Sequence, residues 1–101
     1  MMKLTRINIW RLAKEYMEDK NVHEGFITNE WIEKVNDALG LKELSDEELC
    51  VAWDMVFLTL DNECLIRRED NKIDEYFKWA DVKSAFTEVV NIEARHRRGE
   101  C

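Results

Sequence analysis

The first part of the chain alternates apolar and polar residues with the period of a helix. Ile9, Leu12 and Tyr16 are three or four positions apart, so they lie on one face of a helix predicted over residues 5–20. The polar residues 21–26, which include a glycine, are expected to form a loop.

Capping signals mark the ends of the next two helices. Thr28 is a suitable N-cap for a second helix, and Gly40 follows its last apolar position, where a left-handed C-cap favours glycine. Ser45 and Glu48 form the S-x-x-E pattern of a capping box, which predicts the start of a third helix. Residues 49–60 of that helix are apolar on nearly every side, so we expect it to be central and buried on most faces.

Two short runs rich in β-branched and aromatic residues follow the third helix. Residues 64–68 and 73–79 are predicted to be the strands of a hairpin around a polar turn at residues 69–72. A last helix is expected from about Asp81, and residues 96–101 are expected to form a frayed tail. The predicted fold class is therefore α+β and mainly helical, with a three-helix core, a two-stranded β-hairpin and a C-terminal helix in one domain.

Composition is typical of a folded intracellular protein. Of the 101 residues, 46% are hydrophobic, which is too high a fraction for a disordered chain. The longest apolar stretch is too short to cross a membrane, and no signal peptide is evident, so a cytoplasmic protein is expected. Cys50, Cys64 and Cys101 are odd in number and lack C-x-x-C spacing. They predict two buried thiols and a free tail thiol rather than a disulfide framework.

One stretch carries a family resemblance. Residues 60–68, LDNECLIRR, resemble the passage from recognition helix to first wing strand in winged-helix proteins, and residues 35–41 are similar to the helix before the turn. The resemblance covers about residues 28–79. Two departures are Cys64, where the family usually has glycine, and a longer connection between residues 40 and 45. The resemblance implies DNA binding by the recognition helix, with phosphate contacts from the wing.

The distribution of charge argues against that mode of DNA binding. The chain has a formal net charge of −7, and residues 42–66 contain one basic and seven acidic side chains. The helix in the place of a recognition helix begins Ser45-Asp46-Glu47-Glu48. Acids in a first turn complement the helix dipole, but this does not explain the absence of lysine and arginine from residues 43–66. Phosphates on both sides of a DNA groove would repel such a helix.

Candidate catalytic groups are few. His23 and His96 fall in the predicted loop and tail, and the sequence His23-Glu24 lacks the second histidine of a zinc-protease helix. There is no nucleophile motif, no phosphate-binding glycine loop and no Cys/His spacing for zinc. We therefore expect a protein that is not an enzyme and uses no cofactor or metal.

The first functional hypothesis is an adaptor or inhibitor whose acidic surface binds a basic site of another protein, such as the nucleic-acid groove of a larger enzyme. By size and charge alone it resembles phage-encoded proteins that mimic DNA and thereby inhibit host or defence enzymes. A further hypothesis is a subunit whose apolar surplus forms a homodimer or other oligomer interface. The residues expected on the acidic surface are Glu43, Asp46, Glu47, Glu48, Asp54, Asp61 and Glu63.

The alternative hypothesis is a winged-helix transcriptional regulator that binds DNA through a basic wing. Arg67, Arg68 and Lys72 would supply the phosphate contacts. Acidic residues are interleaved with these three, which favours a solvated surface instead. Of the four tryptophans, Trp10 and Trp79 would be natural binding anchors if they were exposed.

Overall fold

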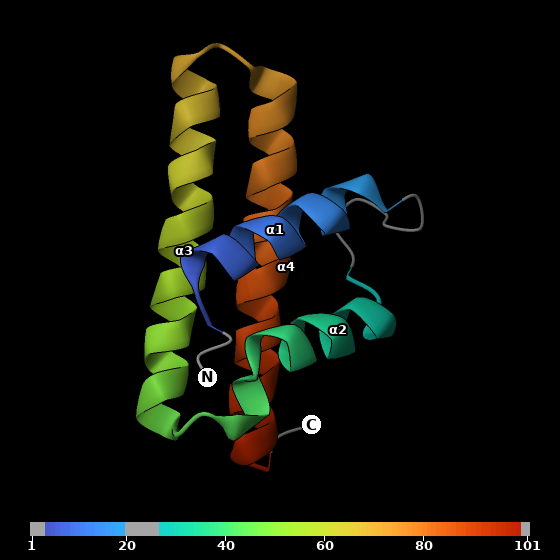
Figure 1. The fold of residues 1–101 in the computed structure, drawn as a ribbon, viewed down its shortest axis with the longest axis vertical. Coiled ribbons are helices and arrows are strands. Elements are labelled where there is room, and N and C mark those ends of the chain that lie inside the picture. The colour runs from blue at the N-terminus through green and yellow to red at the C-terminus, as the bar shows by residue number, and fades with distance from the viewer. Residues whose placement is uncertain (1–3, 20–26, 100–101) are drawn as a thin grey trace.

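The computed structural model describes residues 4–19 and 27–99. In Figure 1, two long helices stand side by side as an antiparallel hairpin, and two shorter helices lie across it. The turn that joins the long helices projects beyond the shorter ones, so one end of the hairpin is uncovered. The elements are α1 (Arg6–Glu18), α2 (Asn29–Leu39), the 3-10 helix η1 (Leu41–Glu43), α3 (Asp46–Glu69) and α4 (Ile73–Arg97).

The predicted α+β class is wrong, because the described residues contain no strand. Residues 64–68 continue α3, and residues 73–79 form the first turns of α4, so the expected β-hairpin and its wing are helical. No glycine or proline interrupts the chain between residues 41 and 98. Buried Leu60 and Cys64, four positions apart, carry the helical period of α3 through the first predicted strand. Tertiary packing on that period outweighs the β-propensity of the short runs.

The polar turn lies where the sequence predicts it but joins two helices. The backbone of Asn71 adopts a left-handed conformation with φ of 58°, which asparagine tolerates better than most residues. The Lys72 amide donates to the carbonyl oxygen of Arg67 at 2.9 Å, and the Asp70 amide donates to that of Ile66 at 3.1 Å. These bonds satisfy carbonyls at the end of α3, and α4 begins at once.

The predicted helix caps are confirmed. The Thr28 hydroxyl accepts a hydrogen bond from the Trp31 amide at 3.2 Å. Gly40 ends α2 in the left-handed conformation, with φ of 63°. At α3, the Ser45 hydroxyl accepts from the Glu48 amide at 3.1 Å, and the Glu48 carboxylate accepts from the Ser45 amide at 2.8 Å. The capping box therefore fixes the first residue of α3 as the sequence indicates.

The hydrophobic core lies where α1 and α2 cover the hairpin. Tyr16 joins the layers, because its ring makes edge-to-face contacts with Trp31 of α2 and Phe86 of α4. The predicted inner residues of the first helix are buried as expected. The buried side of α3, called its inner face below, consists of Leu49, Ala52, Val56, Leu60 and Cys64, which are at most 4% exposed.

A polar network closes the end of the molecule that lies opposite the hairpin turn. Arg97 donates to the Glu93 carboxylate at 3.0 Å, to that of Asp46 at 3.1 Å and to the Leu41 carbonyl at 2.8 Å. Glu93 is only 6% exposed, and its hydrogen bond with Arg97 is the main reason why the guanidinium pKa lies above its ordinary value. The sequence places Arg97 in a frayed tail, whereas here it ties α4 to α3 and η1.

The cysteines agree with the prediction in part. Cys64 is buried, and burial raises the pKa of its thiol, but Cys50 is exposed, so the expectation of two buried thiols is wrong. Cys101 and His23 lie outside the described residues. Within the described ranges, no helix has both the length and the apolar character needed to cross a membrane.

Candidate protein-binding surface

α3 carries a second apolar face that the core does not cover. Val51, Leu58 and Leu65 are 57%, 56% and 41% exposed, and they follow one another at intervals of seven residues. Seven residues are close to two helical turns, so these three side chains, called the outer stripe below, lie in one line along the helix. The expectation that this helix is buried on most of its faces is therefore wrong.

Acidic residues share the outer face of α3 with the outer stripe. Glu47, Asp54 and Asp61 also recur every seven residues, and each precedes a stripe residue by four positions. Side chains four apart are neighbours on a helix surface, so acidic and apolar side chains alternate along this face. We call Glu47, Asp54 and Asp61 the acid row. The combined spacing of four and three residues is that of the two core positions in a heptad repeat.

Most of the acid row keeps its charge available to a partner. Glu47 and Asp54 are exposed, and neither forms an ion pair with any described residue. Asp61 accepts a hydrogen bond from Lys83 of α4 at 3.0 Å, and its side chain remains 33% exposed. α3 carries no basic residue before Arg67, so nothing on its own surface neutralises the row over about five turns.

The other acids expected on the binding surface have structural partners. Asp46 is paired with Arg97, and Glu63 with Arg67 at 3.0 Å, where the Glu63 side chain is 17% exposed. Glu48 accepts from Ser45 in the capping box, and that hydrogen bond lowers the pKa of the Glu48 carboxyl. The structure therefore brings three of the seven candidates into one row. Glu43 lies apart from α3, in η1.

The basic residues of the alternative hypothesis lie at the uncovered end of the hairpin. Arg67 forms ion pairs with Glu63 and Glu75, and its guanidinium stands 5.5 Å from the centre of the Trp79 ring. Arg68 is exposed at the end of α3, and Lys72 is exposed at the start of α4. Because the wing is absent from the described residues, these three side chains are not presented on a β-hairpin.

A cleft between α1 and α3 borders the outer stripe. It has a volume of about 590 Å³ and shares Leu58 with the stripe. On the α1 side it is lined by Ile7, which is 62% exposed, and by Trp10, which is 38% exposed. The Trp10 ring stacks on buried Trp79 with centroids 6.4 Å apart, and this contact holds it beside the cleft. Of the two tryptophans considered as anchors, only Trp10 is accessible.

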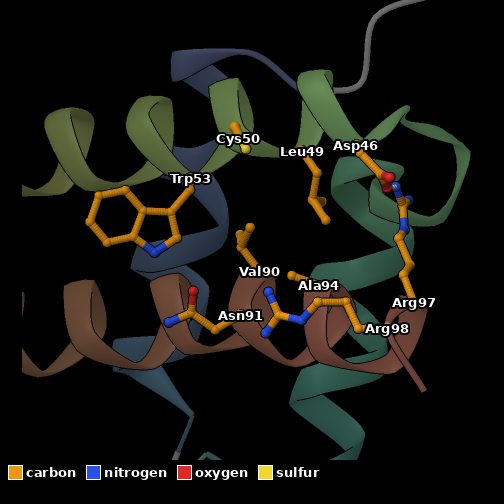
Figure 2. Close-up of a pocket in the computed structure, with 9 residues that line it drawn as sticks. All are labelled: Asp46, Leu49, Cys50, Trp53, Val90, Asn91, Ala94, Arg97 and Arg98. Carbon is orange, nitrogen blue, oxygen red and sulfur yellow. Dashed lines mark hydrogen bonds and ion pairs between the residues drawn. The ribbon is translucent and has the colours of Figure 1, made fainter. Parts of the chain in front are cut away.

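A second groove lies between α3 and α4. Figure 2 shows Trp53 and Leu49 from α3 opposite Val90 and Ala94 from α4, with the ribbons of α1 and α2 behind them. The groove has a volume of about 350 Å³, and the ion pair between Asp46 and Arg97 closes one end. Its polar end is thus already engaged in holding the fold together.

No group of three or more histidine, cysteine, aspartate or glutamate side chains in the described part of the chain is arranged to hold a metal ion. Comparisons of the chain with protein-family models, with curated proteins and with solved structures gave no match. The surface of α3 is therefore the feature of the described residues that bears on function.

The sequence contained the signal for this surface, although the acidic residues alone do not reveal it. Every seventh residue from Val51 to Leu65 is apolar, and every seventh residue from Glu47 to Asp61 is acidic. Two such series, offset by four positions, indicate one composite face on any helix that contains them.

Proposed function

We propose that the protein is a non-catalytic protein-binding module that recognises a basic segment of a partner through the exposed face of α3. In this role it acts as an adaptor or an inhibitor, since both act by binding another protein. The observation that carries the proposal is the acid row, in which Glu47 and Asp54 are exposed and not used in any ion pair of the described fold.

Electrostatics supports a basic partner. Charges of one sign on a surface steer a partner of opposite charge and raise the rate of association, and they suppress binding of partners with the same charge. The row adjoins exposed leucine and valine side chains, so burying the same face also removes apolar area from water. Charge would select the partner, and apolar contact would hold it.

The test uses two double variants that differ in where the charges are reversed. The first is Glu47→Lys with Asp54→Lys on α3. The matched control is Glu30→Lys with Asp37→Lys on α2, because this pair has the same residue types and the same spacing, is likewise exposed, and has its glutamate in the first helical turn. Each chain is used as bait for cross-linking capture in the cells that naturally produce the protein, and captured proteins are quantified by mass spectrometry.

The proposal predicts that the wild type and the α2 control capture the same protein, whereas the α3 variant loses it. Circular dichroism should show unchanged helix content in both variants, since the replaced carboxylates have no partner in the described fold. Capture should also weaken as salt rises, because exposed charges are screened over about 8 Å at physiological ionic strength. The proposal is overturned if capture is unchanged in the α3 variant, or if the wild type instead binds duplex DNA and loses it on Arg68→Ala.

A further inference from the structure

We infer that the partner presents an amphipathic α-helix whose basic and apolar residues alternate at the spacing of the acid row and the outer stripe. This inference rests on the proposed function and names the class of structure that the exposed face of α3 recognises. In this inference the three residues of the outer stripe and the three acids form one binding surface.

The spacing of the surface points to a helix. Acidic and apolar residues follow each other at intervals of four and three from Glu47 to Leu65, and Arg68 continues the series. A straight seam of this spacing accepts the side chains of a second helix packed alongside at a small angle, as in coiled coils. The seam is roughly 30 Å long at the rise of an α-helix, which corresponds to three heptads of a partner.

The charges of the surface point to a basic helix. One of the two seam positions is apolar in every heptad, and the other is acidic until Arg68. A partner helix that offers leucine at one position and lysine or arginine at the other would cover the stripe and pair each acid. A partner that is apolar at both positions would bury the carboxylates of Glu47 and Asp54 without a cation, at a large desolvation cost.

A second copy of the chain fits this surface poorly. In a parallel pair of α3 helices, each acid would face the same acid of the second copy, and like charges repel. In an antiparallel pair the two kinds of seam position face each other, so each acid would be buried against an apolar side chain. Neither direction gives Glu47 or Asp54 a cation.

The cleft between α1 and α3 supplies a pocket at the middle of the seam. Leu58 belongs to both the stripe and the cleft, and Ile7 and Trp10 form the opposite wall. A long apolar side chain of the partner helix, entering between Leu58 and Ile7, would fill this cleft.

The test uses synthetic helical peptides of three heptads as probes. The patterned peptide is made in two forms that exchange leucine and lysine between the two core positions, with alanine and glutamine elsewhere, because parallel and antiparallel pairing with α3 require opposite arrangements. The form that binds α3 more tightly is the patterned peptide used in the tests. The control peptide has the same composition in scrambled order. Affinities for the full chain are measured by fluorescence anisotropy. The protein variants are Leu58→Ala and Ile7→Ala at the surface, with Ile73→Ala, 50% exposed near the hairpin turn, as the matched control.

The inference predicts that the patterned peptide binds at least about tenfold more tightly than the scrambled one. Leu58→Ala should weaken binding by about tenfold, the usual effect of losing a central apolar anchor, and Ile7→Ala by less. Ile73→Ala should leave the affinity unchanged. Thermal unfolding of each variant confirms that the fold is intact, as expected for side chains that are about half exposed or more.

Three outcomes would overturn the inference, and they separate it from the proposed function. Equal binding of both peptides would show that charge alone is recognised. Failure of the patterned peptide to bind, while capture in cells still depends on Glu47 and Asp54, would mean that the partner is basic but not such a helix. Sedimentation of the wild type as a dimer that Leu58→Ala dissociates would show that a second copy occupies the face. Loss of the acid-row dependence in cells would remove the proposed function as well.

Discussion

The two faces of α3 both carry apolar residues at helical spacing, but they differ in what covers them. The inner face, from Leu49 to Cys64, is at most 4% exposed because α1 and α4 pack against it, whereas the outer stripe is 41–57% exposed. The inner residues are spaced by three or four positions without interruption by charge. The outer ones alternate with acids. The comparison shows that apolar residues alone do not define a core, since the neighbouring charges decide which face folding can bury.

The largest loss of stability is expected when a leucine on the inner face is truncated. Leu60 is fully buried, so Leu60→Ala should lower the free energy of unfolding by about 2–5 kcal/mol, through lost apolar burial and a cavity. Urea denaturation followed by circular dichroism measures this change. A loss below about 1 kcal/mol would mean that the inner face is not the core.

The next largest loss of stability is expected when the polar network around Arg97 is broken. Arg97→Leu would leave the buried Glu93 carboxylate with only the amide of Asn36, at 3.5 Å. We expect the free energy of unfolding to fall by about 2–3 kcal/mol, since a buried charge that loses its partner is costly. Arg95→Leu, which removes an exposed pair with Glu88, is the control and should change stability by less than about 1 kcal/mol.

Phe57 sits at the border between the two faces and should respond less strongly than Leu60. It is half-buried, its ring stacks on Trp53 at 5.2 Å, and Lys83 stands 4.9 Å from its centre. Phe57→Ala should therefore cost about 1–2 kcal/mol rather than the 3–5 kcal/mol of a fully buried phenylalanine. Equilibrium unfolding in urea distinguishes the two ranges.

Truncation on the outer stripe should have the smallest effect on stability. Leu58→Ala removes a side chain that is 56% exposed, so the free energy of unfolding should change by no more than about 0.5 kcal/mol. The pair Leu60→Ala and Leu58→Ala thus compares the same substitution two positions apart. Equal losses in both variants would contradict the assignment of the two faces.

The sequence predicted the parts of the fold that depend on local chemistry. Thr28, Gly40, Ser45 and Glu48 mark helix ends because their hydrogen bonds involve residues only three or four positions away. The first helix and its inner residues followed in the same way from the periodicity of apolar positions. The position of the hairpin turn was also predicted, although its type was not.

The remaining features depend on residues that are distant in the sequence. Residues 64–79 suit a strand or a helix locally, and packing of Trp79 against Trp10 on a long α3–α4 hairpin decides for helix. A helix that is apolar on all sides does not reveal which face stays uncovered. Likewise, the position of Arg97 near the C-terminus suggested a frayed tail. The contacts that hold it could not be predicted, because its partners Asp46 and Leu41 are more than fifty residues away in the sequence.

The most direct test of the account exchanges one pair of charges across the seam. Asp54→Lys should weaken binding of the patterned peptide by at least about tenfold, because a lysine would then face the lysines of the peptide. A peptide in which glutamate replaces the lysine opposite residue 54 should restore the affinity for Asp54→Lys and bind the wild type poorly. We predict that the affinity is restored only when the glutamate peptide is combined with Asp54→Lys. If the glutamate peptide binds both proteins equally, or neither, α3 does not recognise a basic helix through the acid row.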